Sequence, residues 1–179
     1  MSLPGRPKGE YRSAQHEGTP ISQFDNTRIA VITAAWHADI VSQAKNSLLA
    51  ELARQGLPKE QVDCFEVPGA FEIPLVAQRL ARAGRHAAIV ACGLVVDGGI
   101  YRHEFVAAAV IDGLMRVQLD SGVPVLSCVL TPQAFHGHTE HQAFFARHFV
   151  AKGQEAARAC LQTLKVARQL DLALAATPV

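Results

Sequence analysis

The sequence lacks an excess of either charge, a long apolar stretch and a close pair of cysteines. Its 179 residues carry 17 Lys and Arg against 16 Asp and Glu, so a basic surface for nucleic acid or for an anionic membrane is not expected. The longest uncharged apolar run, about 87–96, is half of the roughly 20 residues that span a bilayer. No basic segment followed by an apolar one precedes the first strand, so we expect a cytoplasmic protein.

The four cysteines are Cys64, Cys92, Cys128 and Cys160. No two of them form a CxxC pair, which excludes the usual motif for zinc or redox chemistry. Cys92 and Cys128 lie inside apolar runs, and we interpret them as buried structural thiols rather than catalytic ones.

The composition, 49% hydrophobic and 18% charged, is typical of a folded domain with a sizeable core. Residues 1–24 contain prolines, glycines and scattered charges without an apolar period. This pattern predicts a flexible N-terminal extension followed by a single domain over 25–179.

Apolar runs of strand length alternate with segments of helical period along the domain. The expected strands are 28–34, 61–67, 87–92 (continued to 96) and 123–130, and the expected helices are 37–55, 71–83, 102–120, 134–148 and 152–172. Continuous apolar strands alternating with helices predict an α/β fold, a flavodoxin-like three-layer sandwich around a four-stranded parallel sheet. Ligands bind such sheets at the carboxyl ends of the strands, which directs attention to loops 34–39, 67–72, 93–104 and 127–141.

One expected helix is apolar on all sides. Across 105–117 the sequence FVAAAVIDGLMRV has no continuous polar face, whereas a surface helix keeps one. We therefore expect this helix to be covered on every side, in part by another subunit. A deep helix within a monomer is the alternative.

The first two strand ends carry an aromatic residue and a tight turn. Trp36, the only tryptophan, offers a flat platform for a ring at the first strand end, although a tryptophan taken alone is more often a core residue. Pro68 and Gly69 predict a turn whose backbone N–H groups can bind a heterocycle, with Glu72 as an acceptor. Alternatively, this is an ordinary turn in which Glu72 favours the helix dipole.

The later strand ends carry glycines, an arginine and histidines. The pair Gly98-Gly99 before a helix start suggests a phosphate cradle, and Arg102 and His103 add positive charge and a proton carrier. The last loop carries His136, His138 and His141, and His148 follows further along the chain. Since no metal-ligand spacing supports a metal cluster there, phosphate binding or oligomer contacts fit better.

These elements in this order resemble the lumazine synthase family over about 28–170. The resemblance rests on VPGAFEIP at 67–74 and on GVPV at 122–125. Segments 36–41 (WHADIV) and 97–105 (DGGIYRHEF) are similar to the second class of these enzymes, from α-proteobacteria, whose members are decamers of two face-to-face pentamers.

The resemblance implies a reaction without cofactor or metal. In it, 5-amino-6-(D-ribitylamino)uracil and 3,4-dihydroxy-2-butanone 4-phosphate condense to 6,7-dimethyl-8-ribityllumazine, phosphate and water, in riboflavin biosynthesis. A scaffold that holds a flavin or lumazine with little turnover is the first alternative. A metal hydrolase built on the last-loop histidines is the second.

The resemblance also implies site residues. Trp36 takes the place of the aromatic residue that stacks on the pyrimidine, Gly99 and Ile100 that of the backbone holding the phosphate, and Ser127 that of a residue from a neighbouring subunit. The expected contacts to the uracil and the ribityl chain are Ala70, Phe71, Glu72, Leu94, Val95 and Val96.

Two departures from the common family pattern concern the catalytic groups. The common loop ends in a histidine that donates a proton, and a gapless match places Arg102 there, with His103 one residue along. Arginine stays protonated at ordinary pH and transfers protons poorly, so the identity of the donor is open. The phosphate-binding arginine of the common form is best matched by His141, which should bind phosphate less tightly than a guanidinium does.

Overall fold

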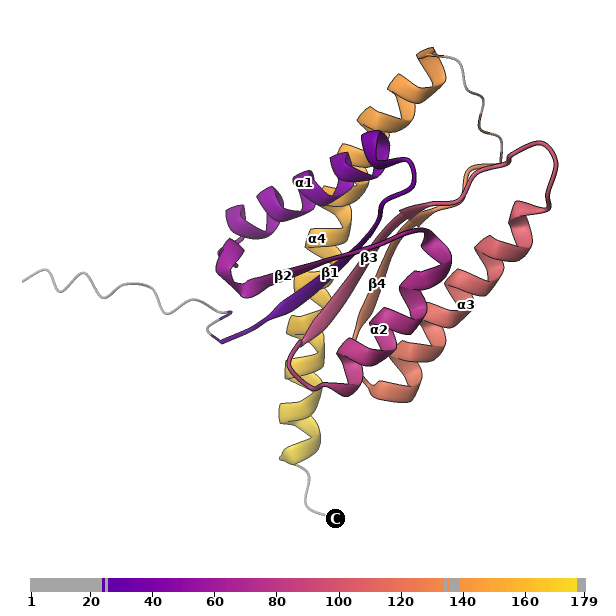
Figure 1. The fold of residues 1–179 in the computed structure, drawn as a ribbon. Helices are drawn as coiled ribbons and strands as arrows, with labels where there is room; N and C mark the ends of the chain where they lie inside the picture. The colour runs from indigo at the N-terminus through magenta and orange to yellow at the C-terminus, as the bar shows by residue number, and fades with distance from the viewer. Residues whose placement is uncertain (1–23, 25, 134, 136–138, 177–179) are drawn as a thin grey trace, which may run out of the picture.

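Within the residues that the structure describes, the core is one parallel sheet. The computed structural model describes residues 24, 26–133, 135 and 139–176. The strands β1 (Ile29–Ala34), β2 (Val62–Val67), β3 (Ala88–Leu94) and β4 (Val125–Leu130) lie in the order β2-β1-β3-β4 (Figure 1). Every residue of β1 and β3 is buried, because inner strands of a parallel sheet are covered on both faces. The continuous apolar runs in the sequence therefore predicted these strands correctly.

Helices cover both faces of the sheet (Figure 1). On one face lie α1 (Ala38–Arg54) and α4 (Thr139–Ala175), and on the other α2 (Ile73–Arg82) and α3 (His103–Ser121). Two short 3-10 helices, η1 (Lys59–Gln61) and η2 (Ala70–Glu72), precede β2 and α2. Alternate residues of β1 belong to two separate apolar cores, Val31 on the α1/α4 face and Ile32 on the α2/α3 face. The predicted three-layer sandwich is confirmed.

The prediction of two final helices is wrong, because the structure has a single 37-residue helix α4. Gly153 lies in its interior, and a Cβ atom there would overlap the carbonyl oxygen of Ala44 and the hydroxyl of Ser47 on α1. The glycine thus permits close packing of α1 and α4 and does not interrupt the helix. Residues 134 and 136–138 of the predicted first segment lie outside the described residues.

Helix α3 buries only one of its faces within the chain. Its buried residues are Ala107, Val110, Leu114 and Val117. The side turned away from them exposes Phe105, Ile111, Met115 and Leu119, and we call these four residues the outer face of α3. The described part of the chain therefore leaves one side of this helix uncovered, and covering by a second subunit stays a prediction.

Other predictions meet the structure only in part. Cys92 and Cys128 are buried, unpaired by disulfide and opposite each other in β3 and β4, which agrees with structural thiols. Residues 1–23 of the predicted extension lie outside the described residues, so its boundary stays a prediction. None of the described helices combines the length and apolar character needed to cross a bilayer.

Candidate active site

A cavity of about 330 Å³ opens at the carboxyl ends of β1, β2 and β3. Its walls come from the segments that follow these strands and from the first turn of α3: Trp36, His37, Ala70, Phe71, Leu94, Val95, Val96, Gly98, Tyr101, Arg102, His103 and Val106. Eight of the thirteen predicted site residues are among them. The cavity lies where a parallel sheet binds its ligands.

Trp36 is a wall of this cavity and not a core residue. Its backbone N–H donates to the carbonyl oxygen of Pro68 at 3.1 Å, one step beyond the bond from Ala35 to Val67. The β1–β2 ladder thus continues past both strands and fixes where Trp36 leaves the sheet. The residue is 66% exposed in the chain, so the core interpretation of Trp36 is wrong.

Glu72 closes the turn that carries Ala70 and Phe71. Its carboxylate oxygen Oε2 accepts a hydrogen bond from the Gly69 N–H at 2.9 Å, which satisfies a free donor at the start of η2. Glu72 does not line the cavity. The hydrogen bond from Gly69 therefore supports the structural role of Glu72 that the sequence offered as the alternative, whereas substrate binding by Glu72 stays a prediction.

The loop between β3 and α3 is shaped by Asp97. The Gly99 N–H donates to Asp97 Oδ1 at 2.7 Å, and Gly99 has φ +73°, a backbone conformation that glycine adopts without strain. Gly99 and Ile100 border the cavity wall formed by Gly98 and Tyr101 without lining it. A phosphate bound by the Gly99 N–H would have to displace the Asp97 carboxylate.

Arg102 and His103 both line the cavity but have different surroundings. The Arg102 Nε donates to Glu104 Oε1 at 2.9 Å, and the guanidinium carbon lies 4.4 Å from the centre of the Phe105 ring, a cation–π contact. The His103 side chain is only 22% exposed, and its Nδ1 lies 3.6 Å from Glu104 Oε2 and 3.9 Å from Asp97 Oδ1.

Glu104 stays ionised beside these two groups. Its carboxylate accepts a hydrogen bond from its own backbone N–H and a second from Arg102, and these bonds hold the pKa of Glu104 below its usual value. Glu104 is therefore a negative partner for the imidazole of His103 and a poor general acid near neutral pH.

Two predicted residues stand away from the cavity of their own chain. Ser127 is exposed on β4, where its hydroxyl oxygen accepts a hydrogen bond from the Val129 N–H at 3.3 Å. His141, in the first turn of α4, packs against Phe135 and Phe145 with ring-centre distances of 5.8 and 5.0 Å. Neither lines the cavity of this chain, and their contribution to a neighbouring subunit's site stays a prediction.

Sequence reasoning missed four residues of the wall: His37, Gly98, Tyr101 and Val106. His37 has φ +56°, a rare conformation for a non-glycine residue that only the structure reveals. Val106 could have been found, because it follows His103 by three positions and so lies on the same helix face.

The last-loop histidines show no metal site among the described residues, where no three His, Cys, Asp or Glu side chains gather as a metal ion requires. His136 and His138 lie outside the described residues.

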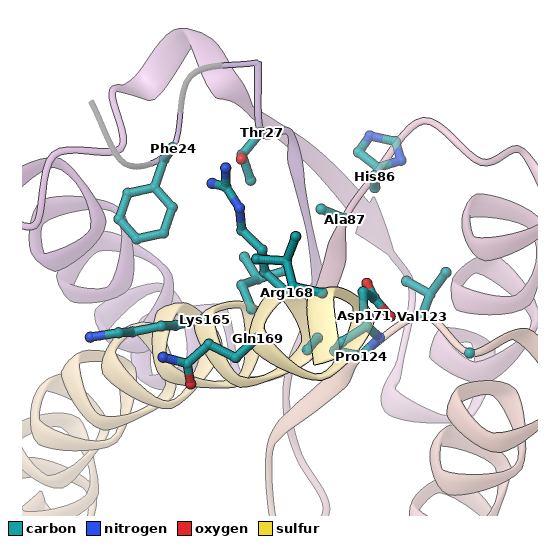
Figure 2. Close-up of a pocket in the computed structure, with 14 residues that line it drawn as sticks. Phe24, Thr27, His86, Ala87, Val123, Pro124, Lys165, Arg168, Gln169 and Asp171 are labelled. Atoms are coloured by element: carbon teal, nitrogen blue, oxygen red, sulfur yellow. The ribbon is translucent and has the colours of Figure 1, made fainter. Parts of the chain in front are cut away.

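A larger cavity of about 550 Å³ lies at the opposite, amino ends of the strands, between α4 and the segments that carry Thr27, His86 and Pro124 (Figure 2). Arg168 points from α4 toward Thr27, whereas the ring of His86 points away (Figure 2) and binds Asp63 through Nε2 at 2.8 Å. Parallel sheets do not place their ligands at this end. We assign the active site to the smaller cavity.

Comparison with known proteins covers the segments that form this cavity. The family model of 6,7-dimethyl-8-ribityllumazine synthase matches residues 26–168. This chain belongs to the lumazine synthase family. The predicted family resemblance is confirmed, and the matched residues include every wall of the cavity.

Curated lumazine synthases are similar over nearly the whole domain. A 6,7-dimethyl-8-ribityllumazine synthase of Rhodococcus erythropolis is 60% identical over 150 residues, 84% of this chain and 97% of the relative. Proteins named 6,7-dimethyl-8-ribityllumazine synthase 2 are 57% identical in Pseudomonas syringae pv. tomato, over 81% of this chain and 85% of the relative, and in Bradyrhizobium diazoefficiens, over 76% and 82%. The second name agrees with the expected second class of lumazine synthases.

Proposed function

We propose that this chain condenses 5-amino-6-(D-ribitylamino)uracil with 3,4-dihydroxy-2-butanone 4-phosphate to 6,7-dimethyl-8-ribityllumazine, with release of phosphate and water. The observation that carries the proposal is the cavity itself. It brings an exposed indole, an apolar wall and the Arg102-His103 pair together at the carboxyl ends of the strands, in a member of the lumazine synthase family.

The cavity suits a flat pyrimidine. Trp36 offers a ring for stacking, Phe71 is a second exposed aromatic residue, and the segment 94–96 supplies an apolar floor. Holding two reactants in such a site can supply up to roughly 7–11 kcal/mol of the barrier. Proximity is therefore the main source of acceleration that we propose for imine formation, phosphate loss and ring closure.

We assign different tasks to Arg102 and His103. Arg102 stays protonated, so it stabilises the negative charge that develops beside the reacting carbons. Proton transfer falls to His103, because imidazole exchanges protons near neutral pH and because Asp97 and Glu104 lie near its Nδ1. Both side chains line the cavity, so both can reach a bound substrate.

The working unit that we propose is a pentamer, doubled to a decamer. The exposed outer face of α3 supports it, since an apolar face of this kind calls for a covering partner. Ser127 and His141 would then complete the cavity of the neighbouring subunit, with Ser127 over the pyrimidine and His141 at the phosphate that Gly99 and Ile100 hold. Cytoplasmic location stays a prediction.

Turnover with both substrates tests the proposal, since the lumazine product is fluorescent. We expect steady-state product formation with release of one phosphate per lumazine and without added metal or cofactor. Binding of the pyrimidine without turnover would instead favour the flavin- or lumazine-binding scaffold, which the Arg102 and His141 departures keep as the second candidate. Activity that depends on tightly bound zinc would favour the hydrolase.

A further inference from the structure

Gly69 lacks a side chain for a reason other than backbone conformation. Its φ and ψ of −137° and 179° describe an extended backbone that any residue adopts. A Cβ atom at Gly69, however, would lie 2.8 Å from Cε3 and 2.9 Å from Cζ3 of Trp36. Carbon atoms in favourable contact are about 3.5–4.0 Å apart, so the indole of Trp36 occupies the space that a side chain at Gly69 would need.

Neither main chain can easily move away from this contact. The Trp36 N–H donates to the Pro68 carbonyl oxygen at 3.1 Å, which fixes the indole-bearing backbone to the turn. The Gly69 N–H donates to Glu72 Oε2 at 2.9 Å, which fixes the turn to the start of η2. A methyl group at position 69 would therefore displace the indole ring, because both main chains are held by hydrogen bonds and Trp36 is 66% exposed.

We propose that Gly69 is a positioning residue for Trp36, and that Glu72 acts with it by fixing the turn. The glycine lets the six-membered ring of the indole lie against the turn, which sets the place of the indole in the cavity wall. The ligand named below rests on the proposed function, whereas the contact between Gly69 and Trp36 does not.

The experiment uses Gly69→Ala in the full chain. Trp36 is the only tryptophan, so the emission spectrum and acrylamide quenching of the ligand-free protein report its position alone. We expect both to change in Gly69→Ala. We also expect affinity for 5-amino-6-(D-ribitylamino)uracil, measured by calorimetry, to fall about tenfold, the lower end of what ring stacking contributes.

A matched control adds the same methyl group elsewhere in the cavity wall. A Cβ atom at Gly98 would meet no atom within 4 Å, so Gly98→Ala should leave the Trp36 emission unchanged. An equal change of emission in both variants would overturn the proposal, because a general disturbance of the cavity would then explain it.

A double-mutant cycle separates positioning from a structural role of the turn. In the Trp36→Ala background the two closest atoms are absent, and the next nearest to a Cβ atom at position 69 is Glu72 Oε2 at 3.2 Å, a contact that a small movement of the carboxylate relieves. We expect Gly69→Ala to cost unfolding stability and pyrimidine affinity in the wild-type background and almost none in this one. The same loss in both backgrounds would overturn the proposal, as would unchanged emission in Gly69→Ala.

Failure of the proposed function gives a different result. If the wild-type protein did not bind the pyrimidine, the substrate assignment would fall. The emission spectra and the stability cycle would still decide whether Gly69 positions Trp36, because neither measurement needs a ligand.

Discussion

Met115 on the outer face of α3 offers a direct test of assembly. The residue is 52% exposed, and complete burial of such a side chain stabilises by about 1.5–3 kcal/mol, so covering the exposed half contributes about 1 kcal/mol. A glutamate there would forfeit this contribution and add an effective desolvation cost of several kcal/mol if the face is covered. In a free monomer the same glutamate would face water and suit a helix.

Light scattering on the eluting protein at micromolar concentration measures the effect. We expect the wild type to have five or ten times the 19.2 kDa mass of the chain, and Met115→Glu to dissociate with its helical circular dichroism intact. Met115→Leu keeps the face apolar at similar volume and should assemble as the wild type does. Equal masses for Met115→Glu and wild type would show that this face is not the interface, and a wild-type monomer would refute the reasoning altogether.

Three further predictions concern single side chains. His103→Ala should lower kcat by about 100-fold or more and remove a limb of the pH–rate profile, whereas Arg102→Ala should lower kcat without changing the shape of that profile. A small fall of kcat in His103→Ala, together with loss of the limb in Arg102→Ala, would reverse the two roles. His141→Ala should raise KM for the butanone phosphate and spare pyrimidine binding, and an unchanged KM would remove His141 from the phosphate site. Hydrogen bonds from Arg54 and Gln55 lower the pKa of Glu51 to about 2, so the ionised carboxylate stabilises the fold above the unfolded pKa of about 4.3, and this contribution disappears as pH falls toward 2. In urea titrations, the difference in unfolding free energy between wild type and Glu51→Gln should therefore shrink as pH falls from about 4.3 to about 2. A difference that stays constant with pH would contradict the assignment.

The sequence predicted the sheet well because burial on both faces leaves an unambiguous pattern. The runs that became β1 and β3 contain apolar or small residues almost throughout, so strand type and parallel pairing followed together. Helix α4 was divided wrongly, because Gly153 is unfavourable in an isolated helix and its use lies in a contact with α1 that only the folded chain makes. Local propensity cannot reveal a contact between residues more than 100 positions apart.

The candidate site was predictable by segment but not by side-chain environment. Strand ends must converge in a parallel sheet, so the grouping of Trp36 with the segments around Ala70 and Val95 followed from topology. The sequence could not show that Glu72 bonds to Gly69 or that Asp97 bonds to Gly99, because each pairing depends on the detailed path of a turn. These two carboxylates show that acidic residues near a binding loop can shape the loop.

Helix α3 connects the chemistry with the assembly. Its N-terminal end carries Arg102 and His103 into the cavity, and its outer face begins directly after them at Phe105. Arg102 itself lies over the Phe105 ring, so a subunit that covers the outer face would also contact the aromatic ring that supports the guanidinium. A partner on α3 would therefore restrict the Arg102 side chain as well as supply Ser127 and His141. For this reason we expect Met115→Glu, which lies on α3 well beyond the cavity residue Val106, to lose activity in parallel with its loss of mass, and its residual kcat to recover at protein concentrations that restore the oligomer.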